Sequence, residues 1–281
     1  MDSSAAPWPP PRGGAHNDPI NKTDPTGLRP CDANLRQLEE HFAETPRDIG
    51  YPLDDFLSDN SESTCLKDLA IGGDGRATVH IGDVATAKDV VILPPSNGQS
   101  LDNLPITEFG NNIRNASGGK VAVVVWLGYN VPDGNLQAAW GETPSHGEFR
   151  ELGRLATGLV ERGKHVTMVG YSYGAVALEG VAGAGGARVH DVVFAGGWTN
   201  LSQVDASDFG GANVWYGIHE RTDHIADVRR INGGRFFSTD GATGHGGYDR
   251  GESLRNIVRI AEGRYGDVTC HGGGSVQSGA C

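Results

Sequence analysis

The stretch from Val166 to Leu178 constrains the fold more than any other part of the sequence, because it joins an apolar run, a G-x-S-x-G pentapeptide and a run of small residues. Together these parts are typical of a buried parallel strand that turns sharply into a helix. Gly170 and Gly174 fit the turn because strand and helix approach too closely there for a Cβ atom. We predict that Ser172 lies at the tip of this turn as a nucleophile, facing the first helix amides. With 43 glycines in the chain, a plain glycine-rich turn is the alternative.

From residue 76 onward, strand-like and helix-like segments alternate, which indicates an α/β fold with a mostly parallel sheet and helices on both faces. A run at 77–81 suits a half-exposed early strand, and Leu254 and Ile257 belong to a last amphipathic helix. A capping box predicts a further helix that begins near Ser145 and ends at Gly163. The other expected elements are strands at 89–93, 120–127, 191–195, 214–218 and 235–238 and a helix at 101–115.

The two ends of the chain differ in character from this region. Residues 1–30 are rich in Pro, Gly, Asp and Asn, so we expect them to be disordered or extended. Residues 31–75 are expected to form a loop and helix extension, with a short helix near 34–44 and an acidic surface loop at 54–63. The α/β domain itself is expected at 76–264, and residues 265–281 are expected to form a tail bounded by cysteines.

The charge balance and the apolar runs exclude two classes of partner. The chain has 23 basic and 35 acidic residues and a net charge of −12. Nucleic acid is therefore not an expected partner, because phosphate binding needs clustered Lys and Arg. No apolar run approaches the roughly 18 residues of a transmembrane helix. The first residues also lack the basic start and apolar core of an export signal.

The four cysteines lie near the two ends of the chain, and none has the spacing of a metal site. Of the three possible connectivities we prefer Cys31–Cys65 with Cys270–Cys281, and each bridge would contribute about 2–4 kcal/mol. Such bridges would indicate a secreted protein, with a processed signal replaced by an initiator Met. The alternative is four reduced cysteines in a cytosolic protein.

A nucleophilic serine needs a base, and the order along doubly wound hydrolases is Ser, then Asp or Glu, then His. His245 is the preferred base because it lies in a glycine-rich loop between the last predicted strand and the final helix. The histidines that remain as alternatives after Ser172 are His190, His219, His224 and His271.

The preferred acid is Asp223, which follows the strand at 214–218 and could reach the imidazole across the loop. Glu220, Asp205 and Asp208 compete with it, and a solvated loop residue is the alternative role.

An oxyanion hole needs two backbone N–H donors, and the sequence restricts both. The first is expected to be Tyr173, the residue after the nucleophile. The second should come from the loop after the strand at 89–93, where Pro94 and Pro95 have no N–H to donate. Ser96 is therefore the expected second donor, and Asn97 is the next candidate.

Three stretches together carry a resemblance to a known family. They are the turn around Ser172, the segment 126–132 (Trp-Leu-Gly-Tyr-Asn-Val-Pro), and His-Gly-Gly-Tyr at 245–248 leading to Ser-Leu-Arg-Asn-Ile at 253–257. From about residue 72 to 263 the chain resembles an uncharacterised α/β-hydrolase family common in actinobacteria. The resemblance implies an α/β-hydrolase fold with Ser172, Asp223 and His245 as a triad, and it implies no substrate. The chain departs from the family at 94–98, where Pro-Gly-Thr-Gly is usual, and at Asn130, where Asp is usual.

These observations predict a secreted serine hydrolase that cleaves carboxylic esters of small-molecule or lipid-like substrates, without a metal or organic cofactor. Tyr129, Asn130 and Tyr171 are expected at the pocket, and Trp126 and Tyr173 could add to a partly aromatic acyl site, although aromatics beside a central strand are often plain core. An acyltransferase or an amidase would use the same residues. The alternative from another class is a non-catalytic binding module of the same fold.

Overall fold

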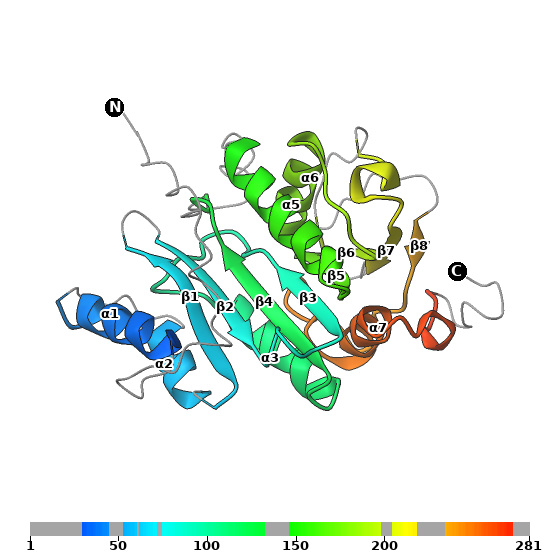
Figure 1. Ribbon diagram of the computed structural model, residues 1–281. Helices are drawn as coiled ribbons and strands as arrows, with labels where there is room; N and C mark the ends of the chain where they lie inside the picture. Colours follow the sequence, from blue (N-terminus) through cyan, green and yellow to red (C-terminus); the bar gives the residue numbers. More distant parts are fainter. Residues whose placement is uncertain are drawn as a thin grey trace.

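One sheet forms the centre of the molecule. The structure is a computed structural model that describes residues 30–44, 53–60, 62–71, 75–132, 146–197, 204–217 and 234–271. The strands lie side by side in the order β1-β2-β4-β3-β5-β6-β7-β8 (Figure 1). They are β1 (Thr64–Ala70), β2 (Arg76–Ile81), β3 (Asp89–Leu93), β4 (Val121–Leu127), β5 (His165–Tyr171), β6 (Asp191–Ala195), β7 (Asn213–Gly217) and β8 (Arg235–Phe236).

The sheet is parallel from β4 to β8. β3 pairs in parallel with β4 and with β5, and β6, β7 and β8 continue in the same direction. Every residue of β4 is buried, as expected for an apolar run that is covered on both faces. β2 runs antiparallel to both of its neighbours, β1 and β4. The predicted α/β fold with a mostly parallel sheet is confirmed.

Helices cover both faces of the sheet (Figure 1). Successive side chains of a strand point to opposite faces, so residues five apart on β5 lie on opposite sides. On one face, a Cβ at Gly170 would lie 2.7 Å from the Cα of Ala175 in α6. On the other face, His165 Nδ1 lies 2.9 Å from the carbonyl oxygen of Ala261 in α7. Helices α6 and α7 therefore cover opposite faces. The helices that pack around the sheet are α3 (Ile106–Ala116), α5 (His146–Glu161), α6 (Gly174–Gly183) and α7 (Gly251–Ala261).

The N-terminal extension contributes more structure than the sequence predicts. Its short helix is present as α1 (Pro30–Glu44), in which Leu38 and Phe42 are buried. The segment expected as an acidic surface loop instead contains α2 (Leu53–Asp59), which buries Leu53 and Leu57. β1 then joins the central sheet as its edge strand, so the sheet begins before residue 76.

Some element ends also differ from expectation. α3 begins at Ile106 rather than near residue 101, because Pro105 occupies its N-cap and Ser100 and Asn103 form a bridge before it. β8 ends at Phe236, two residues before the predicted end at 238. The tail begins with a short 3₁₀ turn, η3 (Tyr265–Asp267), and Cys270 forms an isolated bridge with Phe237.

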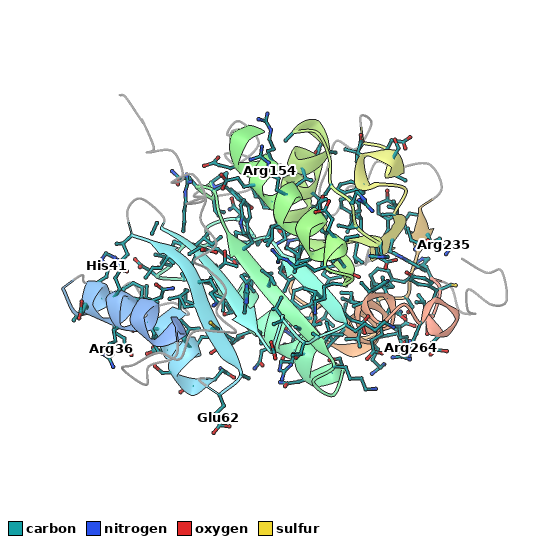
Figure 2. The ribbon with its side chains drawn as sticks, in the orientation of Figure 1. Arg36, His41, Glu62, Arg154, Arg235 and Arg264 are labelled. Atoms are coloured by element: carbon teal, nitrogen blue, oxygen red, sulfur yellow. The ribbon has the colours of Figure 1, made fainter. Side chains whose placement is uncertain are left out.

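Charged side chains such as Arg36, Glu62 and Arg154 are exposed around this core (Figure 2). Among the described helices, none is both long and apolar enough to cross a membrane.

Two cysteines in the described part of the chain are oxidised. Cys65 on β1 and Cys270 beside β8 are each disulfide-bonded. These two strands are opposite edges of the sheet, so Cys65 and Cys270 cannot be partners of each other. The pairing with Cys31 and Cys281 lies outside the described side chains and stays a prediction.

Candidate active site

The sharp turn from strand to helix around Ser172 is present where the sequence predicts it. β5 ends at Tyr171, α6 begins at Gly174, and Ser172 lies between them with φ +53°. This left-handed backbone is unfavourable for a residue with a side chain, and it persists only where the surrounding structure enforces it. The amide of Ser172 donates to the carbonyl oxygen of Ala195 at the end of β6 (3.2 Å). Ser172 therefore lies at the carboxyl end of the parallel strands.

Close packing explains the glycines of the turn. A Cβ at Gly170 would lie within 3.0 Å of two backbone atoms of Ala175. A Cβ at Gly174 would approach the carbonyl oxygen of Pro94 to 3.0 Å. Gly197 is a further close approach that the sequence did not single out, because its Cβ would lie 2.4 Å from the Cβ of Ala175. The turn is thus packed against both neighbouring loops.

Ser172 and His245 lie in direct contact. The distance between His245 Nε2 and Ser172 Oγ is 2.6 Å, within hydrogen-bond range. His245 comes from the loop between β8 and α7, where Gly244 has φ +63°. Ser172 is only 5% exposed, whereas His245 is half-buried. The pair is arranged so that the imidazole can accept the serine proton.

Of the alternative bases, His190 lies at the opposite end of the sheet. It precedes β6, and its Nδ1 accepts a hydrogen bond from the amide of Val166 at the start of β5 (3.1 Å). His219 and His224 lie outside the described residues.

The predicted acid, Asp223, also lies outside the described residues, as does its competitor Glu220. The other two competitors have a local role. The Asp205 carboxylate accepts from the amide of Ser207 (2.8 Å), and the Asp208 carboxylate accepts from the amide of Asp205 (2.7 Å). This capping box surrounds the short turn η2 (Ala206–Phe209).

The loop after β3 packs against the turn at Ser172, because a Cβ at Gly174 would lie 3.0 Å from the carbonyl oxygen of Pro94. Tyr129 donates from its hydroxyl to the carbonyl oxygen of Pro95 (3.0 Å), and Gly98 donates from its amide to the carbonyl oxygen of Pro132 (3.0 Å). Ser96 lies between Pro95 and Gly98 and is buried. Its amide donates no hydrogen bond to a backbone carbonyl oxygen among the described residues. The other predicted donor, Tyr173, is the N-cap residue of α6.

The three predicted pocket residues occupy different environments. Tyr129 is fully buried and packs against Trp126 and Phe149, with ring centroids 6.0 and 5.6 Å away. Burial raises the pKa of Tyr129 far above its usual value, so its hydroxyl stays protonated and donates to the loop. Asn130 is exposed, and Tyr171 is half-buried beside His245. The side chain of Tyr129 is thus part of the core behind the loop after β3.

Phe109 and Tyr248, which pack around Tyr171 behind His245, were not predicted from the sequence as part of the site. Tyr171 packs edge-on against Phe109 of α3, with ring centroids 5.8 Å apart, and lies 6.1 Å from the ring of Tyr248. The signal for Tyr248 was its place in the glycine-rich loop of His245. Phe109 gave no signal beyond helical spacing. In the described part of the chain, no group of His, Cys, Asp and Glu side chains could hold a metal ion.

The chain is similar in sequence to known proteins. Residues 72–233, more than half of the chain, match the family model described as "Alpha/beta hydrolase". The chain is also 25% identical over 231 residues to uncharacterised proteins from two strains of Mycobacterium tuberculosis. That alignment covers 76% of this chain and 33% of each relative, so the chain spans about a third of their length.

Solved structures with a similar fold are more distant. An α/β serine hydrolase without a lid from Xanthomonas campestris is 15% identical, with a TM-score of 0.46, and the match covers 72% of this chain and 95% of that one. An esterase named E25 is 9% identical, with a TM-score of 0.47, and the match covers 82% of each chain.

Proposed function

The chain belongs to the α/β-hydrolase family, and from this premise we propose that it is a serine hydrolase that cleaves carboxylic esters through an acyl-enzyme on Ser172. The observation that carries the proposal is the 2.6 Å contact between Ser172 Oγ and His245 Nε2 at the carboxyl end of the sheet. A strained serine in a turn, in hydrogen-bond contact with a histidine, is the arrangement that nucleophilic catalysis needs.

The reaction would proceed in two halves. Ser172 Oγ attacks the ester carbonyl carbon while its proton passes to His245 Nε2, and the amides of Ser96 and Tyr173 stabilise the negative oxygen. The protonated imidazole then gives its proton to the departing alkoxide, which leaves as an alcohol. In the second half His245 takes a proton from water and the hydroxide attacks the acyl carbon. The bond from that carbon to Ser172 Oγ then breaks, the carboxylic acid leaves, and the proton on His245 returns to Ser172 Oγ. Asp223 would fix the imidazole tautomer.

A fluorophosphonate probe tests this proposal directly. The wild-type protein should be labelled on Ser172, and Ser172→Ala should not react. Ser172→Ala and His245→Ala should each lower kcat on p-nitrophenyl esters by about 10⁴-fold or more. Folded wild-type protein that is not labelled would instead favour the non-catalytic binding module.

The substrate class follows from a second measurement. A panel of p-nitrophenyl esters of increasing chain length would show whether small-molecule or lipid-like esters are preferred. An acyltransferase or an amidase would use the same Ser172 and His245, because the outcomes differ only in the acceptor that meets the acyl-enzyme. Adding alcohol or amine acceptors to the assay, and replacing the ester by an amide, separates these outcomes.

We also propose that the protein is exported to an oxidising compartment. The support is that Cys65 and Cys270 are both disulfide-bonded, which is rare for proteins in the reducing cytosol. Cys31 lies close to Asn34 in α1, and the side chain of Asn34 donates to the carbonyl oxygen of Leu66 (2.9 Å). This contact favours Cys31–Cys65, and Cys270–Cys281 would then be the second bridge.

A further inference from the structure

Tyr171 contacts the base in two ways. Its hydroxyl donates to the main-chain carbonyl oxygen of His245 (2.8 Å), and its ring stacks on the imidazole, with centroids 5.4 Å apart and planes 27° apart. We infer that Tyr171 is a positioning residue that holds His245 against Ser172. This inference rests on the proposed function, and it assigns Tyr171 to the base rather than to the pocket for the acyl group.

Tyr171 supports a loop in which glycines flank His245. Gly244 has φ +63°, and Gly246 and Gly247 follow the histidine, so ordering this stretch costs more backbone entropy than ordering residues with side chains. A Cβ at Gly246 would meet no atom within 4 Å, whereas a Cβ at Gly247 would lie 2.5 Å from the amide nitrogen of Thr243, so the loop packs closely on itself only on the Gly247 side of this pair. The bond from Arg250 to the carbonyl oxygen of Gly246 is long (3.3 Å), and the arginine side chain is 64% exposed.

Tyr171 can provide this support because it is itself fixed. Its backbone is the last residue of β5 and pairs with Ala195 of β6. Its ring lies edge-on to Phe109 of α3, 5.8 Å between centroids, and near the buried ring of Tyr248. A hydrogen bond from a strand residue to a glycine-rich loop restricts the position of the loop, as a supporting residue does for a catalytic group.

The two contacts have separable effects. The hydroxyl fixes the main chain of His245, and so sets the distance from Nε2 to Ser172 Oγ. The ring face lies beside the imidazole and favours the cation that forms when the proton moves from Ser172 Oγ to His245 Nε2, since an aromatic face attracts a cation within about 6 Å. Tyr171 exchanges no proton with the substrate in this scheme.

Tyr171→Phe removes the hydroxyl and keeps the ring. We expect kcat and the rate of phosphonylation of Ser172 to fall on the order of 10-fold with KM nearly unchanged, because a misplacement of about 1 Å in an active site can cost about 10²-fold. Tyr171→Leu removes both contacts and should cost more. Rates are expressed per active site titrated with the fluorophosphonate, so that a partly unfolded variant does not imitate a slow one.

Tyr265→Phe is the matched control. Its hydroxyl donates to Asp191 (2.9 Å) at the amino end of β6, at the far end of the sheet from Ser172. This variant should lower the thermal midpoint and leave kcat per active site unchanged. It therefore shows what the loss of one tyrosine hydroxyl does to the fold alone.

A double variant separates positioning from a general structural role. If Tyr171 acts through the imidazole, Tyr171→Phe in a His245→Ala background should not lower the residual rate further. A further fall in that background, or a single Tyr171→Phe variant that reacts at the wild-type rate, would overturn the inference while the proposed function stands. Wild-type protein that the probe does not label would overturn the proposed function instead.

Discussion

The residue that most directly links backbone geometry to chemistry is Ser172. Its φ of +53° places a side chain in a region that glycine occupies freely, and only one other described non-glycine residue, Asp68, shares a positive φ. The strain is maintained by the packing of β5 against α6, where Gly170 approaches the backbone of Ala175. We therefore expect stability and activity to conflict at this position.

Ser172→Gly and Ser172→Ala separate the two quantities. Both variants should be inactive, because neither has a nucleophile. Ser172→Gly should be more stable than Ser172→Ala by roughly 1 kcal/mol, because glycine adopts the left-handed region without strain. Chemical denaturation of the two variants measures the difference, and equal stabilities would show that the surroundings impose no strain on residue 172.

The oxyanion hole gives a second prediction at this scale. Ser96→Ala keeps the backbone N–H and should change kcat little. Ser96→Pro removes the N–H and should lower kcat by roughly 10²–10³-fold. A phosphonate adduct solved in a crystal provides the check, because its oxygen should lie within hydrogen-bond distance of the Ser96 nitrogen. If that oxygen lies beside Asn97 instead, the second donor is assigned wrongly.

The helices and strands that could be predicted from the sequence are those whose pattern of apolar residues is uninterrupted. The strands predicted at 89–93 and 120–127 correspond to β3 and β4, in which nearly every residue is buried. β1 was missed because Lys67 and Asp68 interrupt its pattern, where the structure has a register shift and a positive φ at Asp68. α2 was missed because its aspartates obscure the buried Leu53 and Leu57.

The same distinction applies to the candidate site. Ser172 and His245 could be predicted because glycines and the order along the chain mark them. The hydrogen bond from the Tyr171 hydroxyl to the carbonyl oxygen of His245 could not be predicted, because it depends on the conformation of a glycine-rich loop. The hydrogen bond from Tyr129 to the carbonyl oxygen of Pro95 likewise depends on how the loop after β4 packs against the loop after β3.

The packing of α6 on β5 makes a prediction about two glycines. Gly170→Ala places a Cβ 2.7 Å from the Cα of Ala175, and backbone atoms cannot move aside cheaply, so the variant should lose about 1–3 kcal/mol of stability. Gly158→Ala in α5 is the matched control, because a Cβ there meets no atom within 4 Å. It should gain up to about 1 kcal/mol, since alanine favours helix. Urea titration of both variants is sufficient, and a neutral Gly170→Ala would contradict the close approach.

For the molecule as a whole, the two ends of the parallel sheet have different roles. The carboxyl end carries Ser172 and His245, and the amino end carries a buried cluster of polar side chains around Asp191. Asp191 there is fully buried and accepts hydrogen bonds from Trp215 (3.0 Å) and Tyr265 (2.9 Å). His165 Nε2 lies 3.2 Å from the same carboxylate. These contacts join β5, β6, β7 and η3.

Both ring nitrogens of His165 face acceptors. Nδ1 lies 2.9 Å from the carbonyl oxygen of Ala261, and Nε2 faces Asp191 and the hydroxyl of Tyr265. Burial opposes the charge, but the hydrogen bond and the charge of Asp191, with smaller contributions from Ala261 and Asp89, raise the pKa of His165 above its usual value. The neighbouring His190 has its pKa lowered by burial and by His165, and its Nδ1 accepts a hydrogen bond from the amide of Val166.

This cluster predicts how stability depends on pH. Because the pKa of His165 is raised on folding, its contribution is complete below the unfolded value near 6.5 and is lost as pH rises through the folded value. His190 has a lowered pKa, so its effect lies below pH 6.5 and not in this window. The unfolding free energy of the wild type should fall between pH 6.5 and mildly alkaline pH, and that of His165→Gln should fall less. Parallel pH profiles for the two proteins would contradict the role of His165.

The disulfides at the two edges of the sheet make a prediction about the whole molecule. Cys65 is on β1 and Cys270 is beside β8, with the full width of the sheet between them. If each bridge closes its own terminal segment, Cys31–Cys65 and Cys270–Cys281 should each contribute about 2–4 kcal/mol, and the two contributions should add, because sites this far apart share no contacts. Peptide mapping under non-reducing conditions identifies the pairs. Removing each pair by Cys→Ser, alone and together, then tests additivity in urea. Bridges that cross from one edge to the other would couple the two segments, and the combined loss would then depart from the sum.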